Sequence, residues 1–374
     1  MNNDPNGNYI ITAELASDGK LSYKGAFSTH GKGLHGLPLG GGDGLFSQSS
    51  VVVSRSKHLL ATVNPGSNTI ALFRINPMNP VELQLVSQPA NSGGEFPVSV
   101  AFDSKGETLC AINSGKINGV NCYHVDDWTG LKPIPNTQRL FGLNQTTPAT
   151  GPANTPSEII FSEDGSQLIA SVKGSSVDQP RFLAIWDINK DGSLSQQFKS
   201  VPAGRGGIRP FGFSTISGKN AFVVADPAIG CEIFDTSGSQ ATAPTSTAVN
   251  VTSQMAICWT AYSHSTGSFY LIDAGNADVV EINVDDYPNI YLYTYALPQG
   301  SGTLDSQIAT IRNGKTSKDY LYLLGAAKTS VDVLSLDGPG KATVVGAFDV
   351  KPIADTHGLA IDPNNLQGMA TYTL

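Results

Sequence analysis

The sequence predicts an all-β fold in which similar units of four antiparallel strands repeat around a ring. The first observation is a pattern that recurs about every 50 residues: an apolar strand start, a turn that carries Asp, Ser or Gly, and a second apolar run. The clearest copies span residues 97–106, 156–165 and 210–218. A fixed period of this length, filled with strands rather than helices, indicates a β-propeller.

The second observation concerns the two ends of the chain. The repeats begin near residues 48, 97, 156, 210, 255, 307 and 357, and the last repeat holds only two strands, residues 357–362 and 367–374. The beginning of the chain supplies two more, residues 8–15 and 21–27. If residues 8–28 complete the last repeat, with residues 8–15 paired to residues 367–374, the ring closes and no strand edge is left unpaired. We therefore predict one domain, residues 1–374, with seven blades; six is the alternative count.

Within a blade, we expect the four strands to follow one another from the axis outward. In the first repeat they are residues 48–53, 58–63, 69–75 and 81–86. Two long connections, the Gly-rich residues 31–46 and the polar residues 139–155, each join an outermost strand to the next innermost strand. Both should therefore cover the same face of the ring, where ordered loops commonly form binding sites.

The composition excludes several classes of partner. Charged residues make up 14% of the chain, the net charge is −8, and no basic run is present. Nucleic acids and anionic membranes are therefore poor partners, because affinity for either depends on clustered Lys and Arg. No apolar run approaches the roughly 20 residues of a membrane-spanning helix. No metal-ligand spacing is visible either, so we expect no metal and no other cofactor.

The four cysteines and two glycosylation sequons bear on the compartment. Cys110 and Cys122 flank a hairpin at equal distances from its midpoint, so a disulfide is geometrically feasible. Cys231 and Cys258 are expected to be either buried thiols or a second bridge. Asn144 and Asn250 begin sequons in loop-like stretches. We expect a secreted glycoprotein, with a cytoplasmic location as the alternative; no signal peptide is visible in this chain, and a cleaved one would leave no trace.

Polar residues at the start of the innermost strands should surround the mouth of the central channel. Such a ring in a concave place is the default hypothesis for a functional site. Its members are Gln48, Glu95, Glu158, Arg209, Gln254, Asp305, Gln307 and His357, with His35 contributed by the Gly-rich loop.

Three members of this ring are candidates for catalysis. Arg209 could bind a substrate carboxylate through two parallel hydrogen bonds, or form an ion pair at the rim. His357 is the candidate for proton transfer, because imidazole titrates near neutral pH, with a structural hydrogen bond as the alternative. Glu158 could act as a base or orient another group. The remaining positions are candidates for substrate binding, or in the case of Gln254 and Gln307 for capping strand ends.

The chain resembles the lactonase family of seven-bladed propellers, which includes the bacterial-type 6-phosphogluconolactonase and the fungal carboxymuconate cyclase. The resemblance covers nearly the whole length through the repeat. Arg209-Pro210 resembles the arginine-bearing strand start of that family, and His357-Gly358 followed by Ile361-Asp362-Pro363 resembles its histidine-bearing start. Within the family, the secreted fungal type is the most similar.

The resemblance implies a lactonase or a muconate-type cyclase that acts on a small carboxylate or lactone without a metal ion. Arg209 would bind the carboxylate, His357 would move the proton, and Glu158 would orient it or act as the base. Cyclisation and lactone hydrolysis both depend on positioning one carboxylate or ester against its reaction partner. The alternative is a non-catalytic secreted propeller that uses the same channel as a binding or interaction scaffold.

Overall fold

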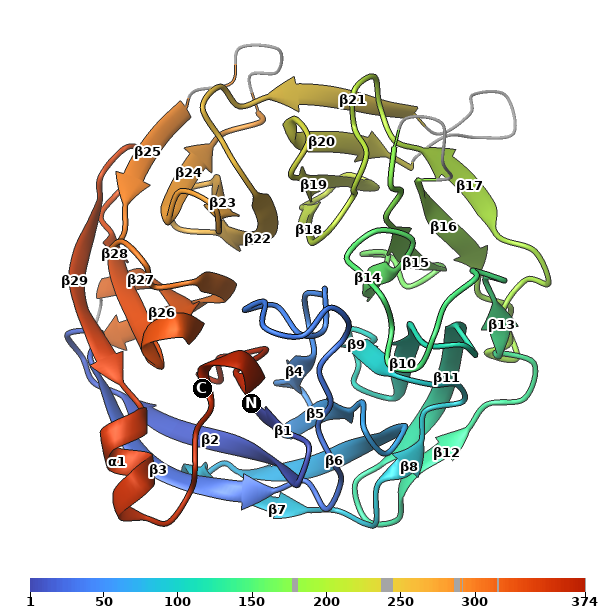
Figure 1. Ribbon diagram of the computed structural model, residues 1–374, viewed down its shortest axis with the longest axis horizontal. Helices are drawn as coiled ribbons and strands as arrows, with labels where there is room; N and C mark the ends of the chain where they lie inside the picture. The colour runs from blue at the N-terminus through green and yellow to red at the C-terminus, as the bar shows by residue number, and fades with distance from the viewer. Residues whose placement is uncertain (177–180, 237–244, 286–289, 291, 315, 374) are drawn as a thin grey trace.

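The computed structural model describes residues 1–374 with the exception of 177–180, 237–244, 286–289, 291, 315 and 374. Seven antiparallel sheets stand around a central axis in this part of the chain (Figure 1). Within each complete blade the strands follow one another in chain order from the axis outward. The prediction of a seven-bladed, all-β propeller is confirmed.

Blades 1 to 3 come first along the chain. Blade 1 consists of β4 (Val51–Ser54), β5 (Leu59–Asn64), β6 (Thr69–Asn76) and β7 (Asn79–Leu85), with the short β8 (Ala90–Asn91). Blade 2 consists of β9 (Pro97–Phe102), β10 (Thr108–Asn113), β11 (Gly119–Asp126) and β12 (Gly130–Pro133), with the short β13 (Arg139–Leu140). Blade 3 consists of β14 (Pro156–Phe161), β15 (Gln167–Val172), β16 (Phe182–Asp187) and β17 (Lys199–Pro202).

Blades 4 to 7 complete the ring. Blade 4 consists of β18 (Phe213–Ile216), β19 (Ala221–Asp226), β20 (Gly230–Asp235) and β21 (Thr245–Asn250). Blade 5 consists of β22 (Ile257–Ser263), β23 (Ser268–Asp273), β24 (Asp278–Ile282) and β25 (Leu292–Ala296). Blade 6 consists of β26 (Thr303–Asn313), β27 (Thr316–Gly325), β28 (Ser330–Leu336) and β29 (Ala342–Asp349), with η1 (Ala326–Lys328). Blade 7 contains β1 (Asn2–Asp4), β2 (Gly7–Leu15) and β3 (Leu21–Ser28), and α1 (Lys351–Thr356) and η2 (Pro363–Asn365) lie beside it.

The second strand of a blade is the most deeply buried element of the fold. Every residue of β5, β19 and β23 is buried. Both faces of each blade contact a neighbouring blade, so these strands need apolar residues on both sides instead of an alternating pattern. This explains why the sequence shows short continuous apolar runs at these places.

The two ends of the chain share blade 7, as predicted, but their pairing differs from the prediction. The sequence indicated that residues 8–15 would pair with residues 367–374. In the structure β2 pairs with β1 and β3, and the C-terminal segment bonds β1: the Met1 carbonyl accepts a hydrogen bond from Gln367 N (3.1 Å), and Asn2 bridges Leu366. The short β1 therefore lies between the C-terminal segment and one end of β2.

The predicted strand at residues 357–362 is wrong, and the described part of the other predicted strand, residues 367–373, is extended chain without a regular strand. Residues 357–362 form the end of α1 and the turn that leads into η2. Pro352 lies in the first turn of α1, where a missing N–H leaves no helical hydrogen bond unmade. Asp362 caps η2 by accepting a hydrogen bond from Asn364 N (2.9 Å), and Pro363 follows it. Local helix-start signals therefore outweigh the strand-like residues between them.

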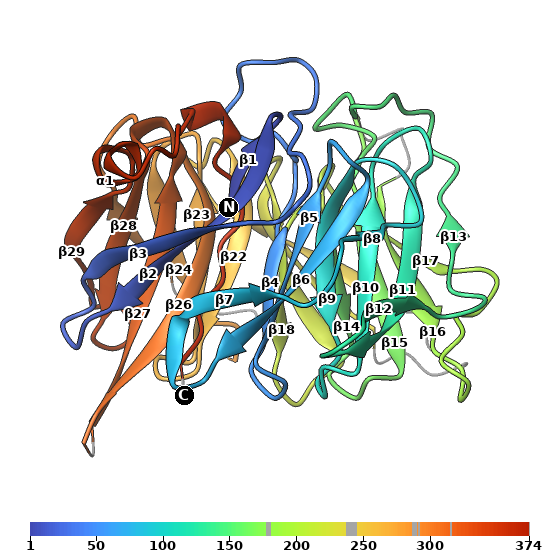
Figure 2. The ribbon, with the colours of Figure 1, turned by 90° about the horizontal axis from the view of Figure 1, so that it is seen from below.

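Two long loops cover one face of the ring, as the sequence predicts. Residues 29–50 project into the centre of the ring (Figure 1), and Figure 2 shows them rising above the same face as α1. The Leu37 N–H donates to the Ala149 carbonyl (2.7 Å), which joins the Gly-rich loop to residues 139–155. No helix in the described part of the chain is long and apolar enough to span a membrane.

A disulfide joins the neighbouring strands of blade 2. Cys110 on β10 and Cys122 on β11 are directly opposite each other, with their Cα atoms 4.0 Å apart, and their sulfurs are bonded. This confirms the bridge that the sequence made feasible. Cys231 and Cys258 are free thiols, so the alternative of a second bridge is wrong.

We predict that this disulfide stabilises the folded state by limiting the unfolded chain. The Cys110→Ser/Cys122→Ser variant should lose about 3 kcal/mol of unfolding free energy, as expected for closure of a loop with a sequence separation of 12 residues. Urea denaturation of the parent and the variant, each with and without dithiothreitol, measures this loss. Dithiothreitol should destabilise only the parent; an equal effect on both proteins would contradict the prediction.

Candidate functional site

Irregular starts of the innermost strands aim three polar side chains at the axis. The pairing register shifts between Pro156 and Ile159 in β14, between Ile257 and Trp259 in β22, and between Thr303 and Ser306 in β26. Bulges of this kind bend a strand and redirect the residue they contain. The redirected residues are Glu158, Cys258 and Asp305.

The carboxylate of Glu158 connects three blades across the channel. Glu158 is 1% exposed and accepts hydrogen bonds from Ser49 Oγ (2.6 Å) and Gln48 Nε2 (3.1 Å), which precede blade 1. It also accepts one from Phe213 N (2.5 Å) of blade 4. Burial, with a smaller contribution from the charge of Asp305, raises the pKa of Glu158 to about 8, although the three hydrogen bonds act in the opposite direction.

Gln48 continues this connection to blade 5. Its side-chain oxygen accepts a hydrogen bond from Thr260 N (2.9 Å), and its own backbone N–H donates to the Ser157 carbonyl (3.1 Å). The close approach requires a glycine in blade 4: a Cβ atom on Gly212 would lie 2.2 Å from Gln48 Oε1. Gln48 and Glu158 thus form a buried bar across the channel, which we call the crossbar.

Lys173, immediately after β15, is fully buried beside the crossbar. Its ammonium donates to the Phe46 carbonyl and to the Pro156 carbonyl (3.4 Å), and lies 4.3 Å from the centre of the Phe211 ring. Burial lowers the pKa of Lys173 far below its usual value; the charge of Asp43 raises it and that of Arg209 lowers it. The amine is therefore more easily deprotonated than an exposed lysine.

The sequence analysis missed Lys173, because nothing in the repeat marks it. At the end of the second strand, other blades carry an Asn or Asp whose side chain serves the following turn: Asn64, Asn113, Asp226 and Asp273. Asp273, for example, accepts hydrogen bonds from Ala256 N (2.8 Å) and Gly275 N (3.0 Å). In blade 3 the matching residue is Val172, which lies opposite Pro156 as Asn113 lies opposite Pro97, and Lys173 directly follows it.

The Gly-rich loop brings a carboxylate and an imidazole to the same region. Asp43 is half-buried and accepts a hydrogen bond from Phe46 N (2.8 Å). Burial raises the pKa of Asp43, while Lys173 and His35 lower it. His35 is buried, and its Nδ1 and Nε2 atoms lie 2.6 and 2.7 Å from the carbonyls of Gly36 and Gly41.

Arg209 reaches this region from blade 4. Its backbone N–H and that of Ile208 both donate to Asp226 Oδ2, at 2.8 and 2.7 Å. Asp226 and Glu232 form a buried carboxyl pair; burial raises the pKa of both groups. The guanidinium of Arg209 is not held at Nε, because this buried atom has no hydrogen-bond partner among the described residues.

Asp305 completes the group on the side of blade 7. It is 4% exposed and accepts a hydrogen bond from Gly368 N (2.8 Å). Burial, with a smaller contribution from the charge of Asp43, raises the pKa of Asp305 to about 7. The structure therefore brings together Gln48, Glu158, Asp305, Arg209 and His35 from the predicted ring, and adds Lys173 and Asp43.

The structure places three other predicted binding residues, Glu95, Gln254 and Gln307, in blade strands or in the connections that precede them. Glu95 is half-buried and accepts a hydrogen bond from Thr147 Oγ1, which ties the loop of residues 139–155 to blade 2. Gln254 donates to the Pro227 carbonyl (2.8 Å) and accepts from Ile257 N (3.2 Å), so it caps the start of β22, the alternative that the sequence analysis allowed. Gln307 lies within β26, opposite Tyr322 of β27.

His357 does not lie at the channel mouth, and its predicted position there is wrong. It follows α1, is exposed, and stacks on Tyr23 of the outermost strand β3 with ring centres 5.0 Å apart. Figure 1 shows α1 at the rim of the ring beside β3. The physical reason is the helix that replaces the predicted strand, which carries this histidine away from the axis.

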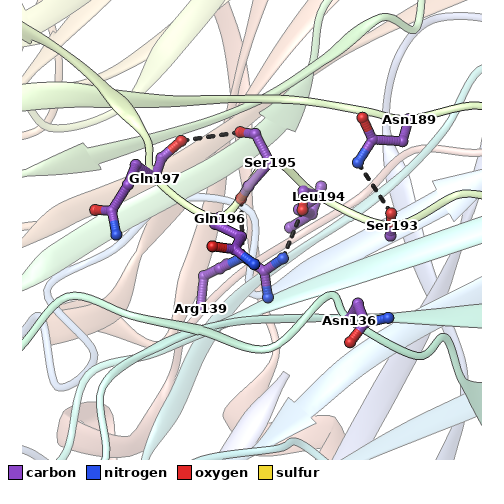
Figure 3. Close-up of a pocket in the computed structure, with 8 residues that line it drawn as sticks. All are labelled: Asn136, Arg139, Asn189, Ser193, Leu194, Ser195, Gln196 and Gln197. Atoms are coloured by element: carbon purple, nitrogen blue, oxygen red, sulfur yellow. Dashed lines mark hydrogen bonds between the residues drawn. The ribbon is translucent and has the colours of Figure 1, made fainter.

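A second hollow lies between the outer parts of blades 2 and 3 (Figure 3). It has a volume of about 540 Å³, and Arg139 is the one ionisable residue among those that line it. The guanidinium of Arg139 donates to the carbonyls of Ser195 (2.8 Å) and Leu194 (2.5 Å), and Asn189 donates to Ser193 Oγ (2.9 Å). The two Arg139 bonds join blade 2 to blade 3, so we assign this hollow a structural role.

Comparisons with known proteins establish the fold. No protein-family model and no curated protein sequence matches this chain. A candidate 6-phosphogluconolactonase of Bacteroides uniformis is 17% identical, with a TM-score of 0.60, and the match covers 81% of this chain and 82% of that one. The periplasmic gluconolactonase of Pseudomonas aeruginosa is 16% identical, with a TM-score of 0.54 and coverage of 78% and 82%.

A third structure, a candidate 6-phosphogluconolactonase of Bacteroides fragilis, is 18% identical, with a TM-score of 0.56 and coverage of 80% and 84%. The expected resemblance to lactonase-type propellers is thus confirmed at the level of the fold. The narrower assignment to a secreted fungal type stays a prediction.

We predict that Gly212 is required by the crossbar. Gly212→Ala should lower the unfolding free energy by about 1–3 kcal/mol, because the added methyl group would overlap Gln48 Oε1. Denaturation of Gly212→Ala, Gln48→Ala and the double variant measures the coupling between the two sites. The cost of Gly212→Ala should shrink in the Gln48→Ala background; strict additivity would contradict direct contact.

We also predict that Glu158 makes stability depend on pH. The pKa of Glu158 is raised to about 8 in the folded protein, so between about pH 4.5 and 8 the folded state binds a proton that the unfolded state has released. Unfolding free energy therefore falls as pH rises through this window, by an amount on the order of a few kcal/mol. Glu158→Gln, which mimics the protonated form, should flatten this fall.

Denaturation of the parent and of Glu158→Gln at pH 5 and pH 8 tests this prediction. Glu82→Gln, at an exposed position of β7, serves as the matched control and should keep the parent's slope. A difference between Glu158→Gln and the parent that is the same at both pH values would show that Glu158 does not titrate in this range.

Proposed function

We propose that the protein is a lactonase-type hydrolase that acts at the channel mouth on a small lactone bearing a carboxylate. The observation that carries the proposal is the cluster of Glu158, Lys173 and Asp305. Burial raises the pKa of Glu158 and Asp305 and lowers the pKa of Lys173, so all three values move toward neutral pH. Groups that can give or take a proton near neutral pH are the requirement for general acid–base catalysis.

Arg209 is suited to hold the substrate carboxylate. Its guanidinium is close enough to lower the pKa of Lys173, and its buried Nε has no partner among the described residues. A buried donor without a partner is unfavourable, and a bound carboxylate would satisfy it. This retains the role that the sequence indicated for Arg209.

Lys173 replaces His357 as the proposed proton-transfer residue, because His357 lies at the rim. The neutral amine of Lys173 would accept a proton from water as the water oxygen adds to the lactone carbonyl carbon. As the ring C–O bond breaks, the ammonium would return that proton to the departing ring oxygen, which gives a hydroxy acid. Glu158 and Asp305 are positioning residues in this scheme, since their own hydrogen bonds fix the crossbar and the seventh blade.

Access to Lys173 requires movement of the Gly-rich loop. The ammonium is bonded to the Phe46 carbonyl, and Asp43 of the same loop lies near it. A substrate would have to displace these contacts, and a loop that opens and closes over the reacting groups is a common way to exclude water. Gly40, Gly41 and Gly42 precede Asp43 and have room around their Cα atoms.

Two of the similar structures are described as candidate 6-phosphogluconolactonases and one as a gluconolactonase, which supports hydrolysis of a lactone. Muconate-type cyclisation is the alternative reaction at the same groups, because it also needs a held carboxylate and one delivered proton.

A non-catalytic scaffold is the second candidate function, and the crossbar favours it. Glu158 accepts three hydrogen bonds, and the side chains of Gln48 and Lys173 also bond to groups within the protein. A channel closed in this way gives the propeller a rigid centre, and binding would then use its outer surfaces.

Secretion remains our proposal for the location. The Cys110–Cys122 disulfide is of a kind that persists in oxidising compartments. Asn144 and Asn250, the first residues of the two sequons, are both exposed, as glycosylation requires, although Asn250 is the last residue of β21 and does not lie in the expected loop.

We predict that Lys173 and Arg209 affect lactone hydrolysis differently. Against a panel of carboxylated and uncharged γ- and δ-lactones, Lys173→Met should reduce kcat by about 10²- to 10⁴-fold. Arg209→Met should mainly raise KM, and only for the carboxylated lactones. Proton release measured by a pH indicator follows the reaction.

Lys199→Met, which removes an exposed ion pair with Asp187 on blade 3, is the matched control and should behave as the parent. Unchanged kinetics in Lys173→Met and Arg209→Met would remove the site assignment. No turnover of any lactone by the parent would favour the scaffold.

A further inference from the structure

Blade 7 contains a cavity where the other blades have a strand. The cavity has a volume of about 510 Å³ and lies between β2 and residues 368–373, with blade 1 on one side and blade 6 on the other. Its walls are mostly aliphatic and aromatic, and include Ile11, Val51, Leu60, Tyr322 and Leu324. We call this cavity the strand slot.

The backbone that borders the strand slot lacks a partner on this side. β1 pairs with β2 only from Asn2 opposite Tyr9 to Asp4 opposite Gly7, whereas β3 covers the outer side of β2 from Tyr9 to Leu15. Among the described residues no strand pairs with the inner side of residues 10–15. Unpaired N–H and C=O groups on a strand edge are ready to bind another strand.

The slot occupies the position of a second strand. In blade 7 the C-terminal residues 368–373 run at the axis, where the Thr371 hydroxyl donates to the Ile308 carbonyl of β26 (2.8 Å), and β2 and β3 lie further out. β1 occupies one end of the space between residues 368–373 and β2. In the other blades the second strand fills this place completely and is almost wholly buried.

We propose that the strand slot binds one extended apolar segment of another polypeptide, which adds to β2 as an antiparallel strand. The segment would continue the line of β1, which already pairs antiparallel with β2, so the new pairing extends an existing interface in the same register. Five residues opposite residues 11–15 would span about 16 Å. Backbone hydrogen bonds to an exposed strand edge, with side chains in apolar walls, are a known mode of peptide binding.

The walls define the side chains that fit. Ile10 contacts the core of blade 1, and Ile11 and Leu15 contact the cores of blades 5 and 6, so the two sides of β2 face different neighbours. A bound strand would face the same two walls and therefore needs apolar residues on both sides. Its amino end would lie beside the ion pair that the exposed Glu14 carboxylate forms with Lys24 (2.7 Å).

The test uses the full chain and a synthetic peptide, Lys-Lys-Val-Leu-Val-Ala-Val, with an amidated end. At a peptide concentration of about 100 times Kd, Tm should rise by about 3–5 °C, and amide hydrogen exchange in the inner edge of residues 10–15 should slow by about 100-fold. The same peptide with alternate N-methylated amides keeps the side chains but cannot pair with β2, so it should produce neither effect.

Two protein variants locate the binding. Ala13→Trp, which fills the slot from β2, should abolish binding, and Ala16→Trp, at an exposed position just beyond β2, should not. Fusion of the peptide sequence directly before Met1 should also abolish binding of free peptide, because the fused strand would occupy the slot. The fusion protein provides this test of the binding site if Ala13→Trp does not fold.

Three results would overturn the proposal. One is equal binding of the N-methylated and unmodified peptides, which would mean that only side chains are recognised. Another is protection of amides elsewhere than in β2. The third is no peptide effect together with binding of a fatty acid such as laurate, which would make the slot a site for small apolar molecules.

Discussion

The scarcity of space at the axis is the constraint on which the candidate site depends. Seven innermost strands converge there, and Ser99 of blade 2 and Gly212 of blade 4 occupy positions equivalent to Glu158. One long polar side chain can therefore cross the axis, and Glu158 does so to reach blades 1 and 4. A buried carboxylate is unfavourable unless hydrogen bonds surround it, so the residues that donate to Glu158 are as necessary as Glu158 itself.

The same lack of space determines the electrostatics of the site. Lys173, Asp43, Asp305 and Glu158 are close enough to affect one another's pKa, and little water reaches them. In such surroundings each charge depends on its neighbours more strongly than on solvent. Binding of one carboxylate near Arg209 would therefore change the protonation of the whole group, which links substrate binding to proton transfer.

Blade 7 shows how a ring can be closed and still leave a place for another chain. Six blades contain all four strands, whereas blade 7 combines β1, β2 and β3 with the C-terminal segment. Closure depends on a few hydrogen bonds between Met1, Asn2 and residues 366–368, and beyond them the apolar walls of blades 1 and 6 enclose a cavity. The slot borders the lactonase-type site at Gly368, whose N–H donates to Asp305, but the two proposals are argued from different residues.

The sequence by itself determined the ring, its seven blades and the disulfide. The strand-turn-strand repeat is local, and Cys110 and Cys122 lie on the two arms of one hairpin, so neighbouring residues are sufficient to predict both. It also indicated Gln48, Glu158, Arg209 and Asp305, because the start of each innermost strand can be recognised from the repeat. His357 was misplaced because Pro352 and Asp362-Pro363 favour short helices over the weak strand pattern between them.

Only the tertiary structure decided which of these residues meet. The Gly-rich loop inserts Gln48 and Asp43 into the centre, and no periodic pattern in the sequence indicates where such a loop will go. Lys173 was overlooked because its importance comes from its burial against the Phe46 carbonyl and the Phe211 ring, which only the folded chain brings to it. The strand slot depends on the pairing of two distant chain ends, and long-range pairing is the one property that local sequence preferences do not specify.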